Sequence, residues 1–155
     1  MAWRALVVTE ARTWLNTPFH HQARLKGVGV DCAMLVRAVG EACGVLTITD
    51  EDWKAFAGYG RTPNPRRMEA AMLKFMKPIG DNNLESWQPG DVCWLQWRRD
   101  LPMHLAIVAV DGASQPGKPR WTIIHALSTM GRVIEHGFTE EWRDRVHSWW
   151  TFPGF

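Results

Sequence analysis

The sequence predicts an α+β domain in which N-terminal helices pack on a curled antiparallel β-sheet of about five strands. Before Trp87, apolar residues recur at helical spacing in three separate segments. After Trp87, short strand-like runs follow one another, separated by turns that contain glycine or proline. Helices first and consecutive short strands afterwards are typical of the α+β class. A chain of 155 residues without an internal repeat or a long linker is expected to form one domain, residues 1–155.

The first predicted helix spans residues 3–15. An apolar stripe runs along it, and Pro18 ends it because the residue before a proline is pushed out of helical geometry. The second predicted helix spans residues 32–43. A glycine-containing turn precedes it, Asp31 caps its start, and Gly44 is expected as its C-terminal cap.

Residues 45–64 are expected to be irregular, with a turn-rich stretch at 58–65. A third helix is predicted to begin with Asn64 as its cap and Pro65 as its first residue, and to stop at residues 78–80. Its apolar stripe consists of Met68, Ala71, Met72 and Phe75.

The predicted strands lie at residues 92–97, 103–110, 121–127, 132–136 and 146–152. A short helix is predicted before the last strand, where Thr139 can act as the cap and two glutamates suit the first turn.

Composition excludes several classes of function. The formal net charge is only +2 and no basic run occurs, so no nucleic-acid partner is expected. No apolar stretch approaches the roughly 18 residues of a membrane span, and the N-terminus does not resemble a secretory signal, so neither membrane insertion nor a leader is expected. Three cysteines without a CxxC pair argue against a disulfide framework and a cysteine-based zinc site. The adjacent His20 and His21 are a poor chelating pair, so no metal or other cofactor is expected.

The sequence contains ten tryptophans, an unusual number for its length. Most are expected in the core, and a surplus would mark a docking surface, because tryptophan is enriched at interfaces.

Cys32 opens the second predicted helix, directly after the capping aspartate. The positive end of a helix dipole favours a thiolate, so this placement suits a cysteine nucleophile. Free cysteine is also among the most buried residue types, so Cys32 is equally suited to the core. The helix alone leaves both interpretations open.

A nucleophilic cysteine needs a base, and the base needs an orienting group. His104 and His125 both lie in predicted strands among apolar residues. A lone strand histidine is usually a hydrogen-bonded structural residue. Two of them on neighbouring strands, downstream of a helix-opening cysteine, favour a catalytic set. His136 and His147 lie near the ends of predicted elements and are expected at the surface.

Five short motifs stand out along the chain: WLNTPF at 14–19, GVDC at 29–32, QPGDV at 88–92, HLAIV at 104–108 and IHA at 124–126. Together they resemble the NlpC-type cysteine peptidases, a papain-like group that cuts bacterial cell-wall peptides. A further stretch, HQARLKGVG at 21–29, resembles the branch that phages and gene-transfer agents encode as a tail component. The resemblance covers most of the chain and implies the papain-like NlpC-type fold, with the catalytic cysteine at a helix N-terminus.

Carried over residue by residue, the resemblance implies that Cys32 is the nucleophile, His104 the general base and acid, and His125 the residue that orients His104. Backbone N–H groups at the start of the cysteine helix would stabilise the oxyanion. His125 would fix the tautomer of His104. Because a neutral histidine carries no charge, it would stabilise an imidazolium less than an aspartate does.

Asp31 and Phe19 are the substrate-binding residues that the resemblance implies. Asp31 matches an aspartate that helps to bind a free substrate amine in relatives, although a role as helix cap is at least as well supported. Phe19 stands where many members have tyrosine, and Ala33 replaces a frequent serine. Two hydroxyls are therefore missing from the substrate side, which leaves the preferred bond open.

The resemblance implies a phage tail-tip-associated peptidoglycan hydrolase, a cysteine endopeptidase that cleaves stem peptides at the bond between D-glutamate and diaminopimelate and aids DNA entry. Its implied partners are the stem peptide and the hub proteins of a tail tip or baseplate. It would be assembled in the bacterial cytoplasm and carried in the virion tail to the host wall. The alternative is a structural tail-tip or baseplate protein with little or no activity. Acyl transfer on lipids is a third interpretation, for which the sequence offers no apolar surface segment.

Overall fold

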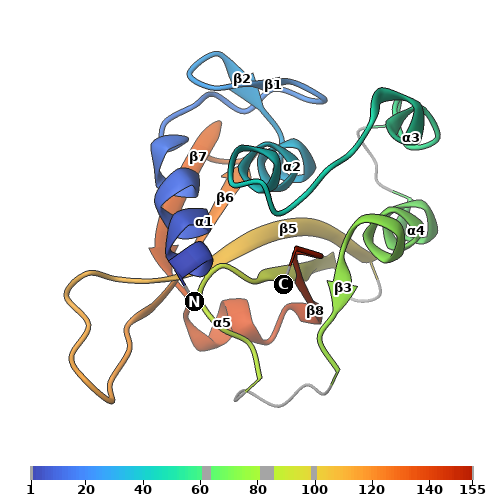
Figure 1. Ribbon diagram of the computed structural model, residues 1–155. Coiled ribbons are helices and arrows are strands. Elements are labelled where there is room, and N and C mark those ends of the chain that lie inside the picture. The colour runs from blue at the N-terminus through green and yellow to red at the C-terminus, as the bar shows by residue number, and fades with distance from the viewer. Residues whose placement is uncertain (1, 61–63, 81–85, 99–100, 155) are drawn as a thin grey trace.

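The computed structural model describes residues 2–60, 64–80, 86–98 and 101–154. Helices gather in the first half of the chain and most strands in the second, which confirms the predicted α+β class (Figure 1). The main sheet has six strands in the order β3-β8-β4-β5-β6-β7, and the pairs between them are antiparallel. A separate hairpin consists of β1 (Arg24–Leu25) and β2 (Gly29–Val30).

Five strands of the main sheet correspond to the five predicted from the sequence. They are β4 (Val92–Arg98), β5 (Leu101–Val110), β6 (Trp121–Leu127), β7 (Arg132–Gly137) and β8 (Val146–Thr151). The sixth, β3 (Lys77–Pro78), pairs with β8 where the sequence predicts only the end of a helix. Proline is tolerated there because β3 is an edge strand, and the backbone N–H groups along its outer edge have no neighbouring strand to bond. The predicted connection between β4 and β5 includes residues 99–100, which lie outside the described residues.

Three helices confirm the predicted ones, with their caps. They are α1 (Ala2–Thr13), α2 (Cys32–Ala42) and α4 (Pro65–Phe75). Asp31 accepts a hydrogen bond of 2.9 Å from the Met34 N–H at the start of α2, and Asn64 accepts one of 3.1 Å from the Arg66 N–H at the start of α4. Gly44 follows α2 with a φ of +70°, as a C-terminal cap requires.

Two short helices complete the chain. The sequence expectation of an irregular segment after α2 is wrong in part, because α3 (Asp50–Lys54) forms there and Thr49 caps it through the Asp52 N–H at 3.0 Å. Of the predicted turn-rich stretch, residues 61–63 lie outside the description. The last helix, α5 (Glu140–Arg143), begins after Thr139 as predicted, but the Thr139 side chain makes no capping hydrogen bond.

Both faces of the sheet are buried, so successive residues of a strand join different cores. Val92 and Trp94 pack under α1 and α2, whereas Cys93 and Leu95 pack in a second cluster on the other face. Stacked rings of Trp87 and Trp149, with centroids 4.6 Å apart, lie in that second cluster.

The tryptophans are buried or half-buried at every position, and all except Trp97 pack in or against the two cores, so they do not form an exposed docking surface. Within the parts of the chain that are described, no helix has the length and apolar character that crossing a membrane requires.

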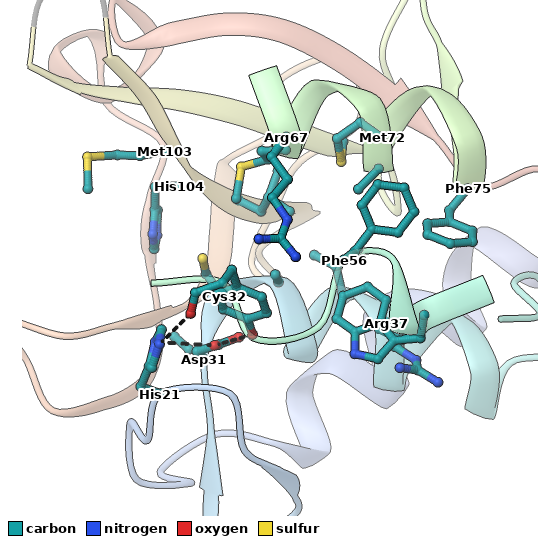
Figure 2. A pocket seen from close by; sticks show the side chains of 18 of the residues that line it. His21, Asp31, Cys32, Arg37, Phe56, Arg67, Met72, Phe75, Met103 and His104 are labelled. Atoms are coloured by element: carbon teal, nitrogen blue, oxygen red, sulfur yellow. Dashed lines mark hydrogen bonds and ion pairs between the residues drawn. The ribbon is translucent and has the colours of Figure 1, made fainter. Parts of the chain in front are cut away.

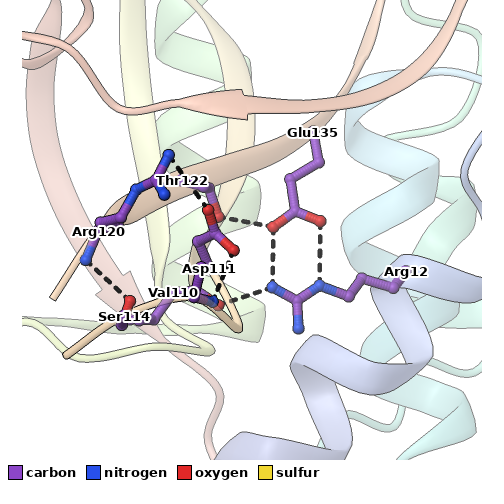
Figure 3. A network of polar contacts seen from close by, with 8 residues as sticks. Arg12, Val110, Asp111, Ser114, Arg120, Thr122 and Glu135 are labelled. Atoms are coloured by element: carbon purple, nitrogen blue, oxygen red, sulfur yellow. Dashed lines mark hydrogen bonds and ion pairs between the residues drawn. The ribbon is translucent and has the colours of Figure 1, made fainter.

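A polar network fastens α1 to the sheet (Figure 3). The Arg12 guanidinium donates to both carboxylate oxygens of Glu135 on β7, at 2.9 and 3.0 Å, and to the Val110 carbonyl of β5 at 2.7 Å. Thr122 of β6 donates to the same carboxylate at 2.7 Å. These contacts join α1 to three neighbouring strands, and so hold the sheet that carries His104 and His125 in fixed register with the helices.

Candidate active site

Cys32 lies at the first residue of α2, where backbone N–H groups lack intrahelical acceptors. The helix begins there because Asp31, in extended geometry, caps it. Cys32 is half-buried and lines a pocket with a volume of about 280 Å³, whose other polar lining residues include Asp31 and His104. Figure 2 shows Cys32 and His104 at one end of this pocket.

The Cys32 thiol is held mainly in its neutral form. Burial raises the pKa of Cys32 to about 12, and the negative charge of Asp31 adds to the rise. The backbone N–H of Leu105 on β5 and those of Ala33 and Cys32 at the start of α2 act in the opposite direction, but they do not outweigh burial. The sequence expectation of a favoured thiolate is therefore wrong for the free protein. A nucleophilic role for Cys32 would therefore require a proton acceptor beside it.

His104 and His125 lie side by side on β5 and β6. Nε2 of His104 is 2.6 Å from Nδ1 of His125, and both side chains are almost fully enclosed. Burial lowers the pKa of His104 to about 4 and that of His125 to about 2, with neighbouring histidines as lesser causes. Both rings are therefore neutral at pH 7, and His104 can accept a proton on the ring nitrogen that does not face His125.

His136 on β7 extends this pair. Its Nε2 is 2.8 Å from Nε2 of His125, and the ring is half-buried. The sequence expectation of a surface residue is therefore wrong for His136, whereas His147 is exposed as predicted.

Asp31 is buried and anchors a second polar group beside the cysteine. Apart from capping α2, its carboxylate accepts the Gln22 N–H at 2.7 Å and the Tyr59 hydroxyl at 2.5 Å. Nδ1 of His21 lies 4.0 Å from the same oxygen. Burial, the charge of Asp31 and the hydrogen bond to it raise the pKa of Tyr59, so the hydroxyl remains a donor.

Tyr59 changes the meaning of the Phe19 substitution. Phe19 lines the pocket, as the sequence predicts, and brings no hydroxyl. Tyr59, the sole tyrosine of the chain, supplies one from a different segment. Its position in an irregular stretch gave no signal in the sequence.

The far end of the pocket is apolar. Helix α4 contributes the predicted stripe, and the segment around α3 adds two aromatic rings, with Phe56 against Phe75 at 5.4 Å between centroids (Figure 2). This apolar wall consists of Val36, Leu46, Ile48, Trp53, Phe56, Met68, Ala71, Met72, Phe75 and Met76. Arg67 lies across it and donates to the backbone carbonyls of Ala55 and Ala57. No sequence signal indicated that α3 closes the pocket.

Comparison with models of protein families gives no match, and comparison with curated protein sequences gives none either. Solved structures do match. A Staphylococcus aureus protein similar to a lipoprotein of the NLP/P60 family aligns with a TM-score of 0.59 at 15% identity, over 97% of this chain and 41% of its own. The NlpC/p60 domain of the peptidoglycan hydrolase SagA aligns with a TM-score of 0.54 at 20% identity, over 96% of this chain and 97% of its own.

An N-acetylmuramoyl-L-alanine amidase from Bacteroides uniformis aligns with a TM-score of 0.62 at 10% identity, over 98% of this chain and 99% of its own. The chain spans less than half the length of the Staphylococcus protein and of a Bacillus cereus NlpC/P60 family protein, of which it covers 39%. Identities this low concern the fold alone. The chain has the fold of the NlpC/P60 proteins.

Proposed function

We propose that this chain is a cysteine peptidase that hydrolyses peptidoglycan stem peptides, with Cys32 as the nucleophile, His104 as its base and His125 as the orienting residue. The observation that carries the proposal is the shared pocket of Cys32 and His104, with His104 hydrogen-bonded to His125 at 2.6 Å. The structural relatives named as a peptidoglycan hydrolase and a muramoyl-alanine amidase support the class of substrate.

In the proposed mechanism, His104 takes the thiol proton as the Cys32 sulfur attacks the amide carbon of the peptide. The C–N bond breaks, His104 returns the proton to the leaving amine, and a thioester remains on Cys32. A water molecule, deprotonated by His104, then attacks the thioester. The C–S bond breaks, the Cys32 sulfur takes the proton back from His104, and the carboxylic acid product leaves. The N–H groups of the first turn of α2 would stabilise the oxyanion in both steps.

The neutral starting state follows from the electrostatics of the pocket. The pKa of Cys32 is raised to about 12 and that of His104 is lowered to about 4, so an ion pair does not form before the substrate arrives. A substrate that excludes water and places its carbonyl at the helix N-terminus would make the proton transfer productive.

The finer proposal is cleavage between D-glutamate and diaminopimelate in a stem peptide that begins with a free amine. Asp31 supports it, because its carboxylate lines the pocket and the groups that donate hydrogen bonds to it, the Gln22 and Met34 N–H groups and the Tyr59 hydroxyl, are uncharged. A free peptide should therefore be cut faster than the same peptide acetylated at its amine. Equal cleavage rates for the free and the acetylated peptide would mean that Asp31 does not bind the amine.

The test of the function compares Cys32→Ala with Cys43→Ala. Cys43 is a free thiol at the opposite end of the same helix and does not line the pocket. Wild type and Cys43→Ala should release muropeptides from purified sacculi, identified by mass spectrometry, and Cys32→Ala should release none. Equal digestion by the Cys32→Ala protein would reject the assignment.

We also propose delivery by a phage tail tip, where hub proteins of the tail or baseplate would bind the β1–β2 hairpin. The resemblance of residues 21–29 to tail-encoded relatives supports this, as does exposure of two apolar side chains, Leu25 at 60% and Val28 at 64%. Replacing both by serine should abolish incorporation into particles while hydrolysis of sacculi persists. A phage with Cys32→Ala should form normal particles that deliver DNA poorly, whereas failure to build tails would favour the structural alternative.

The apolar wall favours acyl transfer as a second candidate, because a hydrocarbon chain would fit beside Cys32. Incubation with phosphatidylcholine vesicles followed by mass spectrometry of the intact protein separates the two. An acyl adduct on Cys32, without muropeptide release, would favour acyl transfer. Absence of an adduct would favour the peptidase.

A further inference from the structure

Three histidines on neighbouring strands form one continuous chain of hydrogen bonds. Nε2 of His104 contacts Nδ1 of His125 at 2.6 Å, Nε2 of His125 contacts Nε2 of His136 at 2.8 Å, and Nδ1 of His136 contacts the Gly137 carbonyl at 2.9 Å. The chain thus runs from the pocket, through the interior of the sheet, to a backbone group on β7.

The Gly137 carbonyl fixes the direction of this chain, because a carbonyl oxygen only accepts. Nδ1 of His136 must therefore carry the proton, and Nε2 of the neutral ring is left as an acceptor. His125 must then donate from Nε2, which leaves its Nδ1 as an acceptor. His104 must donate from Nε2 in turn.

Only this assignment of protons satisfies all three contacts when the rings are neutral. It leaves Nδ1 of His104 unprotonated, and among the described residues none forms a hydrogen bond with that nitrogen. Nδ1 is the nitrogen that can serve the pocket, because Nε2 is occupied by His125. A backbone carbonyl on β7 thereby determines which nitrogen of a ring on β5 is basic.

We propose that His136 is a positioning residue of this site: anchored by the Gly137 carbonyl, it sets the tautomers of His125 and His104 so that the His104 Nδ1 lone pair is available to Cys32. The proposal rests on the proposed function for its consequence, the rate of proton transfer, but the tautomers themselves are properties of the resting protein.

Aromatic side chains enclose the chain of histidines and keep its geometry. The Trp142 ring of α5 lies 5.2 Å from the His125 ring and 5.0 Å from the His136 ring, between centroids. The centroid of the Trp97 ring lies 5.8 Å from that of His104 and 6.2 Å from that of Trp142. With water restricted, the hydrogen bonds between the rings have few competitors.

The same proton arrangement serves both states of the base. When Nδ1 of His104 accepts the Cys32 proton, Nε2–H of the imidazolium continues to donate to the His125 lone pair. No ring has to flip and no proton has to move elsewhere, so the site is arranged for the reaction in advance. In the reverse assignment, Nδ1 of His104 would carry the proton and could not accept another.

The direct test is ¹⁵N NMR of the histidine rings in the intact protein at pH 8, above the ordinary imidazole pKa of about 6.5. We expect Nε2–H tautomers for His104 and His125 and the Nδ1–H tautomer for His136. An Nδ1–H tautomer at His104 or at His125 overturns the proposal. The measurement needs no turnover: these tautomers in a protein that does not digest sacculi would reject the proposed function and leave this inference standing.

Variants test the influence of His136. His136→Phe removes the acceptor, whereas the amide oxygen of His136→Gln can accept from Nε2–H of His125. We expect mixed tautomers at His125 and about a 10-fold lower kcat with unchanged KM for His136→Phe, and recovery of both in His136→Gln. The control is His147→Phe. His147 is exposed and is not one of the three hydrogen-bonded histidines, so this variant should have the tautomers and kcat of wild type. Wild-type tautomers and kcat in His136→Phe contradict the proposal, and if that variant does not fold, wild-type NMR and His136→Gln still decide it.

Discussion

The two ends of the pocket are built differently. The polar wall comes from the start of α2, with Cys32 and its cap Asp31, and from β5 with His104, and hydrogen bonds of 2.5 to 2.9 Å fix the Asp31 and His104 side chains. The apolar wall comes mainly from the short helix α3, the segments on either side of it and one face of α4, with Val36 of α2 beside them, and ring contacts hold its aromatic side chains together. We infer that the polar wall governs the chemical step and the apolar wall governs which substrate binds.

The largest expected effect belongs to the polar wall. His104→Ala should lower kcat by about 10²- to 10⁴-fold, because general acid–base catalysis contributes about that much, with little change in KM. Steady-state kinetics on a soluble stem peptide, with circular dichroism to verify folding, would measure it. A rise in KM with kcat preserved would mean that His104 only binds substrate.

Tyr59→Phe tests the contact that joins the two walls. The hydroxyl donates to Asp31 from the segment that continues the apolar wall. A hydrogen bond to a charged group stabilises the folded protein by about 1.5–3 kcal/mol, so its loss should lower the free energy of unfolding, leave Asp31 less constrained and raise KM, with kcat within about threefold of wild type. The control adds a hydroxyl at a different place on the apolar wall. The double variant Tyr59→Phe/Phe56→Tyr should keep the raised KM of Tyr59→Phe. Restoration of the wild-type KM would mean that the position of the hydroxyl is unimportant.

Phe56→Ala tests the apolar wall itself. The ring lines the pocket and contacts Phe75 and Trp53. Its removal should raise KM by roughly 3- to 10-fold through lost apolar contact, with kcat unchanged. Leu73→Ala, at an exposed position of helix α4, is the control and should behave as wild type. A drop in kcat as large as that of His104→Ala would contradict the inference that the apolar wall governs substrate binding and not the chemical step.

The smallest expected effect is the change of kcat/KM between pH 7 and pH 5. The pKa of His104 is lowered to about 4, so the base stays deprotonated at pH 5. An ordinary histidine, with a pKa of about 6.5, would be about 30-fold less available as a base at pH 5 than at full deprotonation. We expect kcat/KM at pH 5 to remain within about twofold of its value at pH 7 and to fall near pH 4. A midpoint near pH 6.5 would contradict the burial of His104.

The same shift links acid to folding. The folded-state pKa values of His104 and His125, about 4 and about 2, lie below that of an unfolded histidine, so the unfolded chain binds more protons below pH 6.5. Stability contributed by the neutral rings is present above that pH and is lost as the pH falls from about 6.5 toward 4. Denaturant midpoints at pH 7 and pH 5 should differ in that direction, and a His125→Asn variant should show a smaller difference.

Local signals were sufficient to predict much of the polar wall. The capped helix start at Asp31 and Cys32 depends on adjacent residues, and the strands of His104 and His125 follow from alternation and turn residues. The helical stripe of α4 was predictable for the same reason. These features are set by a few residues each, and tertiary contacts did not override them.

The rest depended on long-range geometry. Tyr59 reaches Asp31 across 28 positions of the chain through a segment without periodicity. His136 joins His125 only because the β6–β7 register pairs it with Ile123, and a slip of one residue would turn it to the other face. The direction of the Cys32 pKa also depends on burial, which no local pattern reports, and burial opposes the helix dipole there.

The most direct test of the central claim is to trap the acyl-enzyme. A soluble stem peptide is mixed with the protein, the reaction is quenched in acid during turnover, and the intact protein is weighed by mass spectrometry before peptide mapping. We predict one added acyl fragment of the peptide on Cys32 in wild type and none in Cys32→Ala. An adduct on Cys43 or Cys93 in wild type, or an equal amount of adduct in Cys32→Ala, would contradict the assignment of Cys32 as the nucleophile.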